Sequence, residues 1–396
     1  MGNDKIILVF VGTYLPGNKA GGPIRSVANL VELLGDEFSF KIITADHDFG
    51  VAAPYPEIES DQWCKVGKAE VYYASGKSLT FPRLIYLINS IHFDILYLNS
   101  FFCFNFTIKP LLLRYFKLIP DRPTILAPRG MFSQGALNQK RLKKQFYLFF
   151  VRAVGLYADI IWQASSKFEK VDIENVFCNA VMKRGAPLVA PDLVGGSTNE
   201  TSYLPRTKTS GALNVVFLSR ISPKKNLDGA LLMLKGLKGD IVFNVYGPEE
   251  DRGYSRLCKD ICKSLPVNIR VIFHGEVGHA QVHKVFSANH LFLFPTFGEN
   301  FGHVILESLM AGCPVLLSDQ TPWRGLEQLG VGWDIPLHAA DKFQAALQAC
   351  VQMNDDAFSS FSKRAFDFAR DHLNDPMALQ QNRELFNYAI AQRQRS

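Results

Sequence analysis

One segment of the sequence, residues 291–314, constrains the fold more than any other because it predicts a buried strand, a loop and a helix in succession. Residues 291–295 form an apolar run that ends at a proline, which is typical of a buried strand. Apolar side chains recur at helical spacing over residues 305–310, and a Gly-Cys-Pro sequence ends that helix. Glu299 falls in the loop, and Glu307 lies on the helix face opposite the leucines. In open α/β sheets, such a loop at the carboxyl end of a strand is where ligands bind.

The residue types in this loop suit a sugar nucleotide. Backbone N–H groups near Asn300, Phe301 and Gly302 open the helix and attract an anion such as a diphosphate. A carboxylate accepts two hydrogen bonds from vicinal hydroxyls, so Glu307 can hold a ribose and Glu299 a hexose. Taken singly, either glutamate could instead be a solvated side chain at a helix start or on an exposed face.

The rest of the chain alternates between predicted strands and helices. In the first half, strands are predicted at residues 6–11, 40–45, 69–73, 95–99, 124–127 and 160–164, with a helix at 26–34. This alternation predicts a parallel, doubly wound sheet. The second half repeats it from Val215, and a chain of 396 residues is too long for one ordinary core. We therefore expect an α/β protein with two domains, residues 1–190 and 191–375, with a linker within 185–212 and a last helix at about 376–392.

Two further loops carry residues suited to an anionic ligand. Arg220 and Lys225 follow a buried strand, and a guanidinium and an ammonium both bind phosphate. The bland interpretation of this cluster is a solvated loop, which we accept for Lys224. Gly21 and Gly22 precede the first helix and let the backbone approach a ligand closely, although an ordinary glycine turn is the alternative.

Together these segments resemble retaining GT-B glycosyltransferases, most closely the family 4 group, whose signature is two glutamates separated by seven residues. The resemblance covers roughly residues 213–330 and includes residues 243–248, 271–277 and 311–319, in the family's order. It implies a GT-B fold of two Rossmann-like domains facing a central cleft, with the acceptor on the first domain and the donor on the second. The terminal helix, about residues 376–396, is implied to pack back on the first domain.

The resemblance also implies roles for individual residues. Glu299, Arg220 and Lys225 correspond to catalytic positions. The implied donor-binding set is Gly21, Gly22, Arg220, Lys225, Gly247, Val277, Glu299, Asn300, Phe301, Gly302 and Glu307. We expect no metal and no cofactor, and a UDP-sugar or GDP-sugar as the substrate.

At one position the chain departs from most of the family. The strand at 124–127 leads into Pro128-Arg129-Gly130-Met131, where most members have a histidine near the transferred sugar. A subgroup shares the arginine, so no catalytic histidine can be carried over. We expect Arg129 to bind a phosphate of the donor or of a lipid-linked acceptor. Arg25 is a second candidate for this role, with a surface position as the alternative.

Positive charge is concentrated in the first half of the chain. The net charge is +6, and residues 1–190 contain 22 Lys and Arg against 16 Asp and Glu. Residues 101–152 contain ten basic side chains, one acidic side chain and many aromatic residues. The basic amphipathic stretch at 138–150 can lie on anionic lipid. Alternatively, it is a solvated helix face whose aromatic side chains pack into the core. No nucleic-acid motif accompanies the charge, so we expect no nucleic-acid partner.

The expected location and activity follow from these features. No apolar run reaches the roughly 18–20 residues that span a bilayer, and no leader is evident, so we expect a cytoplasmic protein, peripheral on the inner face of the plasma membrane. The expected activity is transfer of a sugar to a hydroxyl of a glycan, with a lipid-linked oligosaccharide of bacterial surface polysaccharide assembly as the acceptor. The alternatives are an epimerase or phosphorylase with the same fold, or a non-catalytic relative.

Overall fold

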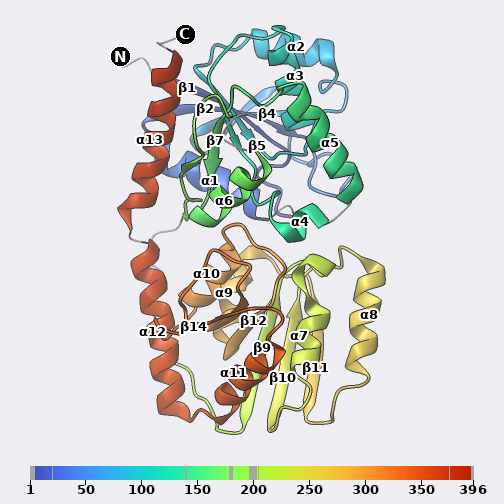
Figure 1. Ribbon diagram of the computed structural model, residues 1–396, viewed down its shortest axis with the longest axis vertical. Coiled ribbons are helices and arrows are strands. Elements are labelled where there is room, and N and C mark those ends of the chain that lie inside the picture. The colour runs from blue at the N-terminus through green and yellow to red at the C-terminus, as the bar shows by residue number, and fades with distance from the viewer. Residues whose placement is uncertain are drawn as a thin grey trace. The chain divides into compact units, whose positions relative to one another are not determined.

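The computed structural model describes residues 5–19, 21–138, 141–177, 182–195, 203, 205–373 and 375–393. The chain forms two compact units, each built around its own sheet (Figure 1). The first unit comprises residues 1–195 together with 376–396, and the second comprises residues 196–375. None of the helices within the described ranges is long and apolar enough to cross a membrane.

The first unit holds an eight-stranded sheet in the order β3-β4-β2-β1-β5-β6-β7-β8. Its neighbouring strands are parallel except for the pair β3 and β4. The strands are β1 Lys5–Val11, β2 Phe38–Ala45, β3 Trp63–Val66, β4 Ala69–Ala74, β5 Ile95–Asn99, β6 Thr124–Ala127, β7 Ile161–Ala164 and β8 Leu188–Val189. The helices are α1 Gly22–Leu34, α2 Phe81–Asn89, α3 Lys109–Tyr115, α4 Gln134–Asn138, α5 Arg141–Ala153, α6 Lys167–Val176 and α13 Pro376–Arg393, with a π-helical turn at Phe104–Ile108.

Both faces of the first sheet are buried, which explains why its strands are continuous apolar runs. Along β1, Leu8 and Phe10 belong to one hydrophobic cluster, and Ile7 and Val9 belong to another on the opposite face. Helix α13 covers part of the second cluster through Phe386, whose ring makes edge contacts with the rings of Phe38, Phe40 and Tyr97. The end of the chain is therefore part of the first unit.

The second unit holds a six-stranded, fully parallel sheet in the order β11-β10-β9-β12-β13-β14. The strands are β9 Ala212–Leu218, β10 Asp240–Tyr246, β11 Ile269–Gly275, β12 Leu291–Phe294, β13 Val315–Ser318 and β14 Gly332–Ile335. The helices are α7 Leu227–Met233, α8 Arg252–Cys262, α9 His279–Ser287, α10 His303–Met310, α11 Ala340–Gln352 and α12 Asp355–Leu373, with a 3-10 turn at Pro223–Lys225.

Each sheet has one point where the strand order reverses. In the first unit, the chain proceeds outward from β1 in one direction and from β5 in the other. In the second unit, β9 and β12 are the corresponding neighbours. Loops that leave adjacent strands at such a point diverge, and the opening between them is where α/β proteins bind ligands.

The predicted fold class of two parallel-sheet α/β domains is confirmed. Two strands of the first sheet and strand β14 of the second were not predicted. β3 is an antiparallel edge strand without buried residues, and β8 has only two residues.

The predicted linker at 185–212 is corrected at its start, because β8 pairs with β7 inside the first unit. Residues 196–202 and 204 of that linker, Gln139 and Lys140 of the basic stretch, and residues 394–396 of the last helix lie outside the described ranges.

Candidate functional site

In the second unit, the loops that follow β9 and β12 are joined at the point where the strand order reverses. The N–H of Phe297 donates to the carbonyl of Lys224 at 2.9 Å. The Asn226 side chain donates to the carbonyl of Pro295 at 2.8 Å, and Asn226 has a left-handed backbone with φ of 58°. Asparagine tolerates this conformation better than most residues. These bonds hold the two loops together at the carboxyl edge of the sheet.

Lys225 and Glu299 form the closest charged pair in these loops. Lys225 Nζ donates to Glu299 Oε2 at 2.5 Å, and both side chains are largely buried. The Lys225 ammonium also lies 5.1 Å from the centre of the Phe294 ring, at the end of β12. An ammonium and a carboxylate held together at a sheet edge provide a cation for a phosphate and an acceptor for sugar hydroxyls.

The surroundings of Glu299 keep it ionised. Burial alone would raise the pKa of this carboxyl, but the charges of Lys225 and Lys224 and the hydrogen bonds from Lys225 and the Asn300 N–H lower it to about 2. At neutral pH the group is therefore a carboxylate, which accepts hydrogen bonds and does not serve as an acid.

This lowered pKa gives a testable pH dependence. The ordinary value is 4.5, so Glu299 contributes stability that is complete above about pH 4.5 and is lost as the pH falls through about 2. The expected loss of unfolding free energy from this group is about 1 kcal/mol by pH 3.5 and on the order of 3 kcal/mol by pH 2. For Glu299→Gln, the free energy of unfolding measured in urea should fall less steeply between pH 6 and pH 3.5. Glu327→Gln, at an exposed position in the same unit, is the control; equal slopes for both variants would contradict this role.

Gly302 determines how α10 begins beside this pair. Its φ is 78°, and a Cβ atom there would lie 2.7 Å from Ile305 Cδ1 and 3.0 Å from Glu299 Cγ. The loop is also tied by Trp323, whose indole N–H donates to the Phe301 carbonyl at 2.6 Å. Glycine thus lets the helix start close to Glu299, and the first amides of a helix have no carbonyl partner within it. An anion at this edge would meet those amides.

Glu307 lies one turn into α10 and faces the start of α9. Its Oε1 is 3.6 Å from Nε2 of His279, the first residue of that helix. Val277 precedes α9 in the loop after β11 and is partly buried. Val277 therefore lies in the loop, and Glu307 in the helix, that follow the carboxyl ends of two strands of the same sheet.

Arg220 follows β9 and is half-exposed. Its Nη1 atom lies 2.9 Å from Glu250 Oε1, in the loop after β10. Gly247 begins that loop with φ of 135°, and a Cβ atom at this position would lie 1.9 Å from the Ser219 carbonyl oxygen. Only glycine allows the two loops to approach so closely. The predicted importance of Gly247 therefore has a backbone explanation.

In the first unit, Gly21 and Gly22 stand at the start of α1, after β1. Gly21 has φ of 69° and caps the helix, and Pro23 occupies its first turn. Arg25 lies in the same turn and is partly buried. These residues belong to the connection and the helix that follow β1, one of the two strands between which the strand order of the first sheet reverses.

Arg129 has a different environment from the one expected of a phosphate ligand. Its side chain is only 6% exposed and forms an ion pair with Asp192, which is 4% exposed. Its remaining N–H groups donate to Asn99 Oδ1 at 2.7 and 3.2 Å and to Tyr97 Oη at 2.8 Å. Arg129 lies beside the end of β5, as its position after β6 predicts. Its guanidinium is thus held by protein groups of the first unit, and the phosphate contact expected from the sequence stays a prediction.

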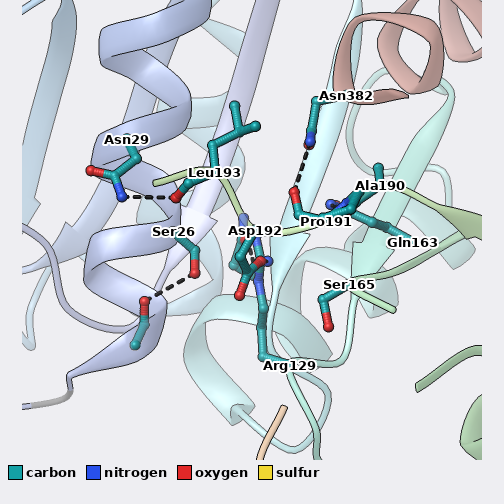
Figure 2. A network of polar contacts seen from close by, with 12 residues as sticks. Ser26, Asn29, Arg129, Gln163, Ser165, Ala190, Pro191, Asp192, Leu193 and Asn382 are labelled. Carbon is teal, nitrogen blue, oxygen red and sulfur yellow. Dashed lines mark hydrogen bonds and ion pairs between the residues drawn. The ribbon is translucent and has the colours of Figure 1, made fainter. Parts of the chain in front are cut away.

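Asp192 belongs to a segment, residues 190–193, that is held from several sides (Figure 2). Asn29 of α1 donates to the Leu193 carbonyl at 2.8 Å, and Asn382 of α13 donates to the Pro191 carbonyl at 2.8 Å. Gln163 of β7 donates to the Ala190 carbonyl at 2.9 Å. The Arg129 ion pair therefore joins the strand ends to a segment that also anchors α1 and α13.

A second buried carboxylate supports the turn that contains Arg129. Glu169 accepts the Gly130 N–H at 2.6 Å and both the N–H and the hydroxyl of Ser165 at 2.8 Å. Burial raises the pKa of Glu169 in spite of these hydrogen bonds. Arg129 and Gly130 both have positive φ, of 56° and 72°, so their turn depends on such support.

The structure thus brings together Lys225, Glu299, Asn300 and Gly302 by direct contacts, and it places Arg220, Gly247, Val277 and Glu307 in loops or helices that follow the carboxyl ends of strands of the same sheet. Sequence reasoning did not identify three partners: Glu250 of Arg220, His279 of Glu307, and Trp323. Of these three residues, only His279 could have been found from the sequence, because it stands where a helix begins.

Two aspartates in the first unit form an Asp-x-Asp tripeptide, but protein groups already bind them. Asp46 accepts from Ser60 at 2.9 Å, and Asp48 accepts the N–H groups of Asn18 and Phe49 at 2.9 and 2.7 Å. Within the described ranges, no group of three or more His, Cys, Asp or Glu side chains is placed to hold a metal ion.

Two parallel-sheet α/β units of this kind are consistent with the GT-B class of fold. Residues 206–365, most of the second unit, match the family described as "Glycosyl transferases group 1". Over these residues, less than half of the chain, the sequence is similar to group 1 glycosyl transferases. A relative from Klebsiella pneumoniae, described as an uncharacterized 41.2 kDa protein in the cps region, is 22% identical over 284 residues, which cover 66% of this chain and 74% of the relative.

Solved structures share the fold at low identity. Anabaena Alr3699/HepE in complex with UDP and glucose matches with a TM-score of 0.68 and 17% identity, over 97% of this chain and 99% of that chain. Sucrose-phosphate synthase from Thermosynechococcus elongatus matches with a TM-score of 0.71 and 16% identity, over 98% and 99%. WaaG, a glycosyltransferase involved in lipopolysaccharide biosynthesis, matches with a TM-score of 0.65 and 13% identity, over 96% and 98%. At these identities the likeness concerns the fold alone.

Proposed function

We propose that the protein is a retaining glycosyltransferase that uses a nucleotide-diphosphate sugar and needs no metal ion. The observation that carries the proposal is the Lys225–Glu299 pair beside the glycine-capped start of α10, where the strand order reverses. The complex of Anabaena Alr3699/HepE with UDP and glucose, a protein of the same fold, supports the donor class. UDP-sugars and GDP-sugars both suit the site.

Each residue of the pair has a distinct role in this proposal. As the bond between the anomeric carbon and the donor phosphate breaks, negative charge grows on the leaving diphosphate. Lys225, Arg220 and the first amides of α10 stabilise that charge. Glu299 orients the sugar hydroxyls and stabilises positive charge at the anomeric carbon, because its low pKa keeps it ionised. Glu307 holds the ribose, and Val277 lies beside the base.

The stereochemistry and the proton transfer belong to the same proposal. The acceptor hydroxyl attacks the anomeric carbon from the side that the diphosphate leaves, so the new glycosidic bond keeps the configuration of the donor. The hydroxyl proton passes to a phosphate oxygen of the leaving group. The products are the elongated glycan and a nucleoside diphosphate, and no further reactant is required.

For the acceptor, we propose a glycan, carried on a lipid, in surface polysaccharide assembly. The Klebsiella pneumoniae relative is described as lying in the cps region, and WaaG is described as involved in lipopolysaccharide biosynthesis. The first unit, which we propose as the acceptor side, carries the excess of basic residues, and these suit a phosphorylated acceptor.

A nucleotide screen tests the donor site. A nucleoside diphosphate at one hundred times its Kd stabilises a protein by about 2.7 kcal/mol. For a unit of this size the melting temperature should rise on the order of 5–10 °C. We expect this rise with either UDP or GDP, and a smaller rise for Glu307→Ala than for Glu327→Ala, an exposed control. The absence of a rise with any nucleoside diphosphate would refute the donor site.

The product then tests the reaction class. Proton NMR of the glycoside should show the anomeric configuration of the donor sugar. Incubation with the sugar nucleotide alone separates the epimerase alternative, because an epimerase changes the sugar without an acceptor. An inverted product, or a changed sugar in the absence of acceptor, would contradict the proposal.

A further inference from the structure

Helix α5 of the first unit carries large apolar side chains on its outer face. Leu142, Phe146, Phe149 and Phe150 are 81%, 74%, 72% and 55% exposed. Relative to Leu142 they stand at spacings of four, seven and eight residues, so they form one stripe along the helix. We call these four residues the α5 stripe. For the three phenylalanines, this corrects the alternative in which the aromatic residues of the basic stretch pack into the core.

The inner face of α5 fixes the direction of the stripe. Leu148 and Val151 are buried in the core of the first unit, and the Tyr147 hydroxyl lies 2.6 Å from the Tyr157 hydroxyl. Lys144 donates to the carbonyl of Ala136 at 2.5 Å. The helix is therefore anchored through one apolar face while a second apolar face points outward. In Figure 1, α5 runs along the outside of its unit.

Basic residues flank the stripe on both sides. On a helical projection, Lys143 falls on one side of the stripe and Arg141 on the other. The Arg152 guanidinium instead donates to the Val176 carbonyl and lies over the Phe177 ring of the same unit. Lys143 and Arg141 are both exposed, and α5 contains no acidic residue. Exposed phenylalanine and leucine between cations is the composition of helices that lie in the interface of an anionic membrane.

The charges also decide between a membrane and a second copy of the chain. A twofold dimer through the stripe would bring two α5 helices together, each with cations on both flanks and no acidic residue to offset them. An anionic bilayer offers phosphates at the depth of the cations and hydrocarbon at the depth of the phenylalanines. The partner that matches both features is therefore lipid.

We propose that α5 docks the first unit on the surface of an anionic bilayer. The α5 stripe enters the boundary between headgroups and acyl chains, and Arg141 and Lys143 contact the lipid phosphates. The docking requires no nucleotide sugar and no turnover, so it can be tested independently of the proposed reaction. As a consequence, the docked protein and a lipid-linked acceptor encounter each other by diffusion in the plane of the membrane.

The full-length protein can be tested by flotation with vesicles of phosphatidylcholine alone or mixed equally with phosphatidylglycerol, without nucleotide. We expect binding to the mixed vesicles to be at least about tenfold stronger, because each cation near an anionic surface contributes about fivefold. Phe146→Ser with Phe149→Ser should weaken binding by at least about tenfold, since two large apolar side chains no longer enter the bilayer. The matched control is Val171→Ser with Leu257→Ser, at two apolar positions about half-exposed elsewhere.

A charge-matched pair tests the cations separately. Arg141→Glu with Lys143→Glu should abolish the preference for anionic vesicles, whereas Lys235→Glu with Lys342→Glu, at exposed lysines of the second unit, should retain it. Both pairs change the net charge equally. In Phe149→Trp, brominated acyl chains should quench the added indole fluorescence, which reports insertion without disrupting the helix.

Three results would overturn the proposal: wild-type protein that does not bind mixed vesicles, serine variants that bind like the wild type, or an indole at position 149 that brominated lipid does not quench. A stripe variant that turns a dimer into a monomer in light scattering, with no vesicle binding by the wild type, would assign the surface to a second copy.

Discussion

Lys225→Met is expected to lower kcat for sugar transfer by about 10²–10³-fold, the usual effect of removing one group that stabilises a leaving or developing anion. Lys225 is held against Glu299 and above Phe294, so no solvent cation can replace it at the same distance. The measurement is initial-rate kinetics with a radiolabelled nucleotide sugar. A fall in kcat with a small change in KM would place the lost interaction in the transition state.

Lys224→Met is the matched control, because it removes the same charge from the adjacent residue of the same turn. Lys224 contributes to the low pKa of Glu299 only through its charge, whereas Lys225 also donates a hydrogen bond. We therefore expect a loss of about tenfold or less, which is a modest electrostatic effect. If both variants fall equally, or if Lys225→Met turns over like the wild type, the Lys225–Glu299 pair is not the centre of the reaction.

Arg129→Met is expected to destabilise the first unit by about 3–5 kcal/mol, because it leaves Asp192 buried without its cation. The Asn99 side chain and the Tyr97 hydroxyl also lose a partner. Urea unfolding followed by fluorescence can measure this, since the buried Trp162 lies in the first unit. The nucleotide-induced rise in melting temperature, which reports on the second unit, should persist.

Removing both members of the pair separates a packing role from a binding role. Arg129→Met with Asp192→Leu should recover much of the lost stability, because buried ion pairs can often be replaced by apolar residues of similar volume. If Arg129→Met leaves stability unchanged and instead raises KM for the acceptor, then Arg129 binds substrate as the sequence suggested. Recovery of stability in the double variant without recovery of activity would add a positioning role.

The part of the site that could be predicted is encoded locally. A strand, a loop and a helix follow one another within residues 291–310, so the pattern itself places Glu299 at a sheet edge and Glu307 on the helix. The same holds for Lys225 in the turn after β9. The contact between Lys225 and Glu299 spans 74 residues of sequence. It was predicted only as convergence on one ligand, because it depends on β9 and β12 being neighbours.

The contacts that the sequence did not show have a common physical cause. Arg129 was expected to bind phosphate because a guanidinium suits phosphate oxygens, and the sequence did not show that it forms an ion pair. Its partner Asp192 is 63 residues away, in a segment expected to be a linker. Likewise, the stretch containing α5 is apolar on two faces, and periodicity cannot tell which face meets the core. Leu148 and Val151 settle that question by their contacts with the first unit.

The sequence alone determined the two α/β halves and the local setting of the glutamates and the cations, because the periodicity of apolar residues is a property of neighbours in the chain. Only the tertiary structure decided which charges are paired, which glycine permits a close approach, and which face of α5 remains exposed. Those outcomes depend on burial and on contacts between distant segments, and a sequence pattern contains neither.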